Sequence, residues 1–133
     1  MSFLRRAARL LIALLVPAAG LAEDAKTAYW LHCAGCHLLD GRSAPPEVPT
    51  LIDEPGVIAG LPGGREYLIR IPGVAQAGLP DEKLAEVLNF MLQTFSPGTT
   101  PAGFQPFTAE EVGKARQQVL IDPLRRRAEI IGD

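Results

Sequence analysis

The sequence of 133 residues has few sulfur and imidazole side chains: two cysteines, two histidines and two methionines. Both cysteines lie in the segment WLHCAGCHLLDG, as Cys33 and Cys36. A structural zinc ion needs four well-spread ligands, and these cysteines with His32 and His37 are too crowded to surround it. Thioredoxin-like chemistry needs a strand–helix–strand pattern beside the cysteine pair, and no strand-like run leads into Cys33. The sequence therefore argues against both kinds of site.

Long hydrophobic runs are also scarce. The run from Leu10 to Val16 is shorter than the roughly 20 residues needed to cross a bilayer. It follows three arginines and precedes small residues that end at Ala22, which is the order of a secretory signal. We expect residues 1–22 to be removed, and the mature chain to begin at Glu23 in the periplasm without a stable membrane span. An uncleaved anchor is the alternative.

Positive charge is in short supply once the signal is removed. The full chain has 13 basic and 15 acidic residues, and three of the basic residues lie in the signal, which leaves 10 minus 15, or a net charge of −5. Nucleic acid is therefore not an expected partner. If the acidic surface steers docking, the partner is basic and association slows as salt rises.

The motif C-x-x-C-H is the main chemical signal of the chain. In an exported protein the simplest use of two cysteines is a disulfide. The alternative is covalent haem c, because cysteines three residues apart present both sulfurs on one side of a helical turn, where they can bond two vinyl-derived carbons. His37 then follows as the proximal iron ligand. The histidine and the export signal both favour haem, so we predict one covalent haem c on Cys33 and Cys36.

These residues resemble the class I (mono-haem) c-type cytochromes. The segment AEDAKTAYWLHCAGCHLLDG is similar to the family's N-terminal helix and haem site, and LPDEKLAEVLNFMLQTF is similar to the C-terminal helix that crosses it. In PTLID, the resemblance implies that the carbonyl of Pro49 accepts the ring N–H of His37. The resemblance covers residues 24–95. It implies an all-α fold, with a small cytochrome c-like domain packed around one covalent haem.

The residue pattern also predicts helices without reference to a family. From Asp81, a good N-cap, apolar residues recur at helical spacing as far as Phe95. Residues 64–71, GREYLIRI, form a shorter amphipathic piece that Pro72 ends. Five prolines between residues 37 and 64 favour an irregular loop around the cofactor. We find no internal repeat.

The composition changes after Phe95. The stretch SPGTTPAGFQPF, residues 96–107, is a Pro/Gly-rich linker. A capping box of Thr108 and Glu111 predicts a helix through about Ile121, and Pro123 predicts the start of a last short helix. The predicted organisation is a signal peptide at 1–22, a haem domain at 23–95, the linker, and a helical tail at 108–133. The tail is either a docking segment, for a partner or for the haem domain, or a solvated appendage.

The loop before the haem domain's last helix, RIPGVAQAGLPD, contains no methionine, although class I cytochromes usually place their distal ligand there. Met91 is the only methionine of the mature chain, and its place in the apolar stripe favours core packing over the alternative of distal iron ligation. His32 adjoins Cys33 and is expected to face solvent. Weaker candidates for the distal position are Gln76, Lys83, Tyr67 and Asn89.

Two functions stay open. The first is an electron-transfer protein, or the electron-transfer subunit of a dehydrogenase, working with periplasmic redox proteins. The resemblance adds a quinoprotein-type dehydrogenase as partner. The second is a haem protein with an open distal site for small-ligand sensing or peroxidase-like activity. Near the expected distal face the loop offers only Gln76 as an evident polar group, so the residues favour a carrier that is not an enzyme. Arg65 or Arg70 would pair the haem propionates, or would lie on a solvated helix face.

Overall fold

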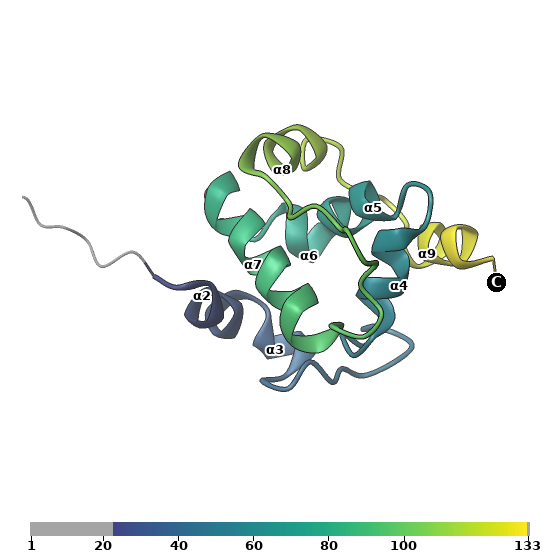
Figure 1. Ribbon diagram of the computed structural model, residues 1–133, viewed down its shortest axis with the longest axis horizontal. Coiled ribbons are helices and arrows are strands. Elements are labelled where there is room, and N and C mark those ends of the chain that lie inside the picture. Colours follow the sequence, from purple (N-terminus) through teal and green to yellow (C-terminus); the bar gives the residue numbers. More distant parts are fainter. Residues whose placement is uncertain (1–22, 133) are drawn as a thin grey trace, which may run out of the picture.

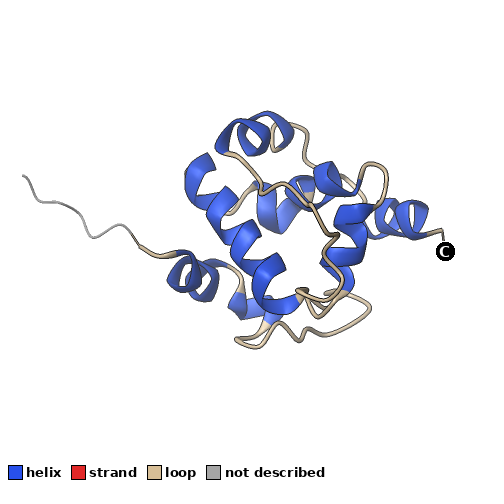
Figure 2. Ribbon diagram, viewed as in Figure 1, coloured by secondary structure: helices blue, strands red, loops and turns tan. Residues whose placement is uncertain are grey.

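Within residues 23–132, which the computed structural model describes, the regular structure is helical and no strand is present (Figure 1, Figure 2). The predicted all-α fold is therefore confirmed. The predicted signal peptide lies outside the described residues. No helix of the described part is long and apolar enough to cross a membrane. The helices are α2 (Ala25–His32), α3 (Ala34–His37), α4 (Glu54–Gly60), α5 (Gly64–Arg70), α6 (Pro72–Ala75), α7 (Asp81–Phe95), α8 (Ala109–Ala115) and α9 (Pro123–Ile131).

Helices α2 and α7 pack against each other and form the frame of the haem domain (Figure 1). Asp24 begins α2 by accepting a hydrogen bond from the backbone N–H of Thr27 at 2.8 Å. Tyr29 is only 1% exposed. Its ring centroid lies 5.2 Å from that of Phe95 and 5.8 Å from that of Phe90. This aromatic cluster fixes where the first helix crosses the last helix of the domain.

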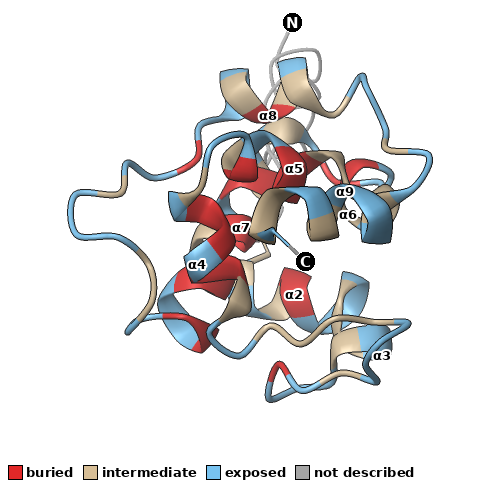
Figure 3. Cartoon of the chain, turned by 90° about the vertical axis from the view of Figure 1, so that its right-hand side faces the viewer, coloured by how far each residue is buried: buried red, intermediate tan, exposed pale blue. Residues whose placement is uncertain are grey.

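The apolar stripe predicted for α7 is buried as expected, and α2, α4 and α5 bury faces of their own (Figure 3). The N-cap is wrong by one position. Pro80 is the capping residue, and Asp81 is the first residue of the helix. The carboxylate of Asp81 accepts a hydrogen bond from Arg116 at 2.9 Å instead of capping the backbone. A contact with the C-terminal tail therefore replaces a local one.

The sequence reading missed two helices, α4 and α6. Helix α6 begins at Pro72, where only the end of a helix was predicted, and α4 lies in a proline-rich stretch that suggested an irregular loop. Pro55 lies in the first helical turn, where a backbone N–H has no partner within the helix and its loss costs nothing. Asp53 precedes α4 with a φ of 63°, and its N–H donates to the carbonyl of Phe95 at 2.9 Å. This bond across the domain fixes the start of α4.

Helix α8 is shorter than predicted, since it ends at Ala115 instead of near Ile121. Beyond it, the N–H of Leu120 donates to the carbonyl of Arg70 at 2.9 Å and draws the chain along α5. Half of the capping box is present, because Thr108 accepts from the N–H of Glu111 at 3.2 Å. The Glu111 carboxylate pairs with Arg65 instead of returning to the cap. Helix α9 begins at Pro123, as predicted.

The tail docks on the haem domain, which was one of the two alternatives. The side chain of Asn89 in α7 pairs with both backbone groups of Phe107, at 3.0 and 2.8 Å. Val112 of α8 is fully buried. Helix α9 lies beside α5 at the end of the molecule away from α2 (Figure 1). Residues 108–132 are thus part of the same packed body as residues 23–95.

Candidate functional site

A cavity of about 480 Å³ brings the C-x-x-C-H motif together with α4, α5, α7 and the start of α9. Its lining includes Cys33, Cys36 and His37 from the motif. Most of the remaining wall is apolar and includes Leu51, Ile58, Leu68, Val74, Leu88 and Met91. Such a wall suits a large, flat, apolar group much better than a charged substrate.

The motif is held by a short turn. Helix α3 forms after Cys33, whose carbonyl accepts from the N–H of Cys36 at 3.2 Å and from that of His37 at 3.0 Å. The chain then leaves through Leu38, whose φ is 59°. The hydroxyl of Tyr29 donates to the Leu38 carbonyl at 2.7 Å and pins this strained residue. Burial raises the pKa of Tyr29 to about 12, so its hydroxyl keeps its proton at neutral pH.

Both cysteines are free thiols, so they do not form the disulfide that was the simplest reading. Before haem is attached, burial, together with the neighbouring Cys36, raises the pKa of the Cys33 thiol to about 11. Cys36 is exposed. Within residues 23–132, no three His, Cys, Asp or Glu side chains gather in a way that would hold a metal ion.

His37 lies in the same cavity wall with one ring nitrogen in use. Its Nδ1 lies 2.8 Å from the hydroxyl oxygen of Ser43. The direction of this hydrogen bond depends on the tautomer of His37. In the tautomer with the proton on Nδ1, the ring donates to Ser43 and Nε2 keeps the lone pair that binds iron. Burial lowers the pKa of His37, and the nearby Pro49 backbone opposes part of this shift, so the ring is neutral. Pro49 also lines the cavity, and its role as acceptor for His37 stays a prediction.

Ser43 is a site residue that the sequence reading missed. It lies in the loop after the motif, and a hydroxyl six residues beyond the histidine has no fixed spacing that would have marked it. Only the course of the chain through Gly41, whose φ is 78°, returns the loop to the ring.

The candidates for the distal position separate into two groups. Met91 and Tyr67 both line the cavity and are 6% and 4% exposed. Burial raises the pKa of Tyr67. His32 lines the cavity edge but is exposed, in keeping with its expected orientation. The other three are not among the lining residues: Asn89 bonds Phe107, Lys83 pairs with Glu86, and Gln76 is exposed.

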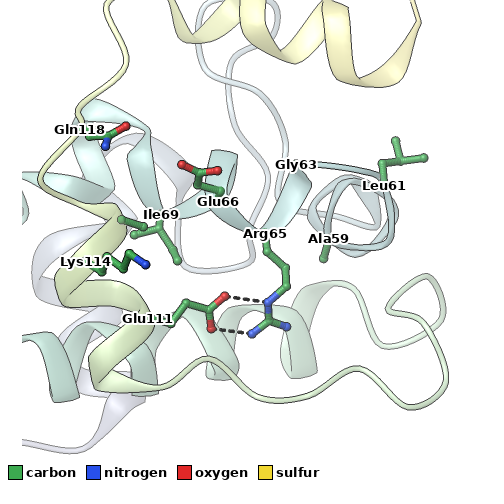
Figure 4. Close-up of a pocket in the computed structure, with 10 residues that line it drawn as sticks. Ala59, Leu61, Gly63, Arg65, Glu66, Ile69, Glu111, Lys114 and Gln118 are labelled. Atoms are coloured by element: carbon green, nitrogen blue, oxygen red, sulfur yellow. Dashed lines mark hydrogen bonds and ion pairs between the residues drawn. The ribbon is translucent and has the colours of Figure 1, made fainter.

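The two arginines expected near the haem propionates lie elsewhere. Arg65 forks onto Glu111 and also donates to the carbonyl of Gln105 at 2.7 Å, beside a separate cavity (Figure 4). Arg70 donates to the carbonyl of Gln118 at 2.6 Å. Arg65 and Arg70 therefore neither line the haem cavity nor lie free on a solvated helix face, because each arginine binds the tail. Both of these predictions are wrong. The arginine that does line the cavity is Arg127 of α9.

The cavity fits haem c in its chemistry. Two free thiols and a neutral imidazole lie on one short turn, which is the donor set for two thioether bonds and one iron bond. Two apolar side chains of the tail that line the cavity are left open to solvent, Ile121 at 101% and Leu124 at 46% exposure. A large apolar group seated in the cavity would cover them.

Comparison with known proteins agrees with this chemistry. No protein-family model matches the chain. A cytochrome c-552 of Thermus thermophilus is 34% identical over 125 residues, which cover 80% of this chain and 84% of that protein. A second cytochrome c-552 of Thermus thermophilus is 35% identical over 109 residues, which cover 68% of this chain and 83% of that protein.

The longer match also bears on the tail. A share of 80% of 133 residues is about 106 residues, which is more than the whole chain up to Phe95 contains. The similarity therefore reaches past residues 24–95, where the sequence reading had placed its end. With the motif, the apolar cavity and these relatives together, the chain belongs to the class I mono-haem c-type cytochromes and binds haem c covalently.

Proposed function

We propose that this cytochrome is an exported, periplasmic electron-transfer protein, working as a free carrier or as the electron-transfer subunit of a quinoprotein-type dehydrogenase. One observation carries the proposal: Cys33, Cys36 and His37 converge on one largely apolar cavity that is walled by packed helices. The cytochromes c-552 found as relatives support the electron-transfer role.

Bound haem supplies a reversible one-electron iron couple. The residues of the chain provide a rigid and dry setting for it. Tyr29 and Phe95 lock α2 to α7, and the Tyr29 hydroxyl holds the turn that follows His37. With haem seated against the apolar part of the wall, fewer water molecules would need to reorient when the charge on the iron changes.

Exposed apolar side chains flank the motif and suit a transient protein contact. Trp30, Leu31, Leu38 and Leu39 are 45%, 71%, 51% and 66% exposed. Large apolar residues that stay in solvent beside a redox site mark a place where a partner can approach closely. The net charge of −5 after signal removal favours a partner with a basic face.

The docking proposal is tested by stopped-flow electron transfer between the reduced protein and a basic redox protein over a series of salt concentrations. We expect the second-order rate to fall steeply as salt rises, because screening weakens attraction between unlike net charges. An acidic redox protein is the control, and its rate should rise with salt. A rate that salt leaves unchanged with every partner would remove the steering argument.

The second candidate function is small-ligand binding at an open distal position. The observation in its favour is that residues 71–80 contain no methionine, histidine or cysteine. The only thioether in the cavity wall, within the described residues, is that of Met91 in α7. An iron without a strong sixth ligand would be partly high-spin when oxidised and would bind carbon monoxide readily when reduced.

Optical and magnetic-resonance spectra of the holoprotein and of Met91→Leu separate the two functions. Leu88→Ile, in the same wall, is the matched control. A low-spin wild type, with a thioether-to-iron band that disappears only in Met91→Leu, would establish a His/Met electron carrier. Ready carbon monoxide binding with similar spectra in all three proteins would favour the ligand-binding function.

Export is tested on the purified protein. Secretion into the periplasm with cleavage after Ala22 predicts a mature chain that begins at Glu23, and N-terminal sequencing reads this directly. A product that retains Leu10–Val16 and partitions with membranes would instead support an uncleaved anchor.

A further inference from the structure

The haem cavity has one polar corner, and the C-terminal tail supplies its positive charge. Arg127 of α9 and Glu54 of α4 both line the cavity, with Arg127 Nη2 lying 2.8 Å from Glu54 Oε2. Tyr67 of α5 is close enough for both charges to act on its pKa, Arg127 lowering it and Glu54 raising it. The consecutive helices α4 and α5 therefore meet the distant helix α9 at this corner.

One N–H donor of Arg127 has no hydrogen-bond partner among the described residues. Its side chain is only 22% exposed, and its Nε is buried without a hydrogen-bond partner among the described residues. Glu54 Oε2 is likewise buried and has no hydrogen bond of good geometry, although it lies close to Arg127. A buried guanidinium with an empty N–H donor is rare, because that donor has lost its water without gaining a partner.

Arg65 shows how the Nε and Nη2 donors of an arginine in this chain bind a carboxylate. Arg65 directs Nε and Nη2 at the two oxygens of the Glu111 carboxylate, at 2.8 and 2.7 Å (Figure 4). The same edge of Arg127 has only the single close approach of Glu54 to Nη2. A second carboxylate could occupy the Nε side while Glu54 keeps its place, since a guanidinium has five N–H donors.

Haem brings two carboxylates into this cavity as its propionates. Of the lysines and arginines in residues 23–132, Arg127 is the one that lines the cavity, whereas Glu47, Glu54 and Asp122 line it with negative charge. A propionate buried among these acids needs a cation. We propose that Arg127 binds a haem propionate through its Nε edge, and that this bond latches the tail helix α9 onto the loaded cavity.

The proposed bond between Arg127 and a propionate explains why Ile121 and Leu124 are exposed. Ile121 and Leu124 line the cavity and yet are exposed, as expected of a wall whose contact is the cofactor itself. The packing of α9 on the domain rests on few buried residues, since none of its own residues is fully buried. Its position therefore depends on polar contacts, of which Arg127 makes the innermost.

The test uses the holoprotein and the variants Arg127→Gln, Arg127→Lys, Glu54→Gln and Arg126→Gln. Resonance Raman spectra report the propionate bending band, and hydrogen exchange reports protection of α9. We expect the band to shift in Arg127→Gln and Arg127→Lys, because neither side chain can form the fork. Exchange of α9 amides should rise at least tenfold in Arg127→Gln. Among residues 23–132 the Arg126 side chain pairs with Glu129 on the surface, so Arg126→Gln should match the wild type in both readouts.

Two results would overturn the proposal. If Arg127 serves Glu54 alone, Glu54→Gln would loosen α9 as much as Arg127→Gln does, and the propionate band would not move in either variant. If the corner binds free small carboxylates, acetate would change the ferric spectrum of the wild type but not that of Arg127→Gln. Should Arg127→Gln fail to fold, an unshifted band in Arg127→Lys would be equally decisive.

Discussion

Arg116 is the residue on which we expect the docking of the tail to depend most. It follows α8, is 14% exposed, and reaches into the haem domain. Its Nε and Nη2 donate to the carbonyl of Ala75 at 2.9 and 2.7 Å, and its Nη1 donates to the carbonyl of Leu79 at 2.8 Å. It thus holds both ends of the loop between α6 and α7.

The structure sets the size of the effect of Arg116→Ala. A hydrogen bond between a charged group and a neutral acceptor contributes about 1.5–3 kcal/mol. The substitution leaves two partly buried carbonyls without that partner, although water can reach part of the site. The ion pair with Asp81 adds less than about 1 kcal/mol, since that carboxylate is 46% exposed. We expect a loss of about 3–4 kcal/mol in the free energy of unfolding.

Guanidinium unfolding of the holoprotein, followed by far-ultraviolet ellipticity, measures this loss. Arg116→Lys should recover little, because an ammonium cannot fork onto one carbonyl from two nitrogens. Arg125→Ala is the control, since Arg125 is 76% exposed and its effect should stay within about 0.5 kcal/mol. If Arg116→Ala costs no more than this control, the tail is not held by these bonds and the reasoning fails.

Two further predictions concern stability. Gly64→Ala should lower the free energy of unfolding by at least about 2 kcal/mol, because an added Cβ would overlap the backbone carbonyl of Ile58. The control, Gly73→Ala, should have a small effect, because Gly73 has open space around it. Equal effects of the two substitutions in thermal unfolding would contradict the packing of α4 on α5. Tyr29 has a folded pKa of about 12 against an ordinary value of 10.0, so the neutral phenol stabilises the fold fully below pH 10.0, and this contribution is lost as pH rises toward 12. Tyr29→Phe should therefore show a shallower fall in unfolding midpoint over that interval, and parallel curves would refute the assignment.

The sequence predicts the parts of this molecule that depend on local pattern. The apolar spacing of α7, the start of α9 at Pro123 and the placing of two thiols and an imidazole on one turn all follow from residues close in sequence. The all-α class was implied by the resemblance to the class I c-type cytochromes, and the helical spacing of residues 81–95 agrees with it. Helix periodicity and motif spacing relate residues only a few positions apart, so both can be predicted from the sequence.

Contacts between distant segments could not be read in this way. The roles of Arg65, Arg116 and Arg127 depend on where the tail lies, and an arginine on a helix face looks the same whether it is solvated or paired. Helix α4 was missed because prolines at a helix start resemble prolines in a loop. The Ser43 contact with His37 depends on the course of a loop.

The most direct test of the electron-transfer account is voltammetry of the holoprotein beside Cys33→Ala/Cys36→Ala and His37→Ala. We predict one reversible one-electron wave for each wild-type chain, with haem that stays attached after denaturation. His37→Ala should keep the covalent haem and shift the wave, because the thioether bonds remain while the proximal iron bond is lost. The double cysteine variant should have no attached haem and no wave. A wild type without a reversible wave, or a double variant that retains covalent haem, would contradict the account.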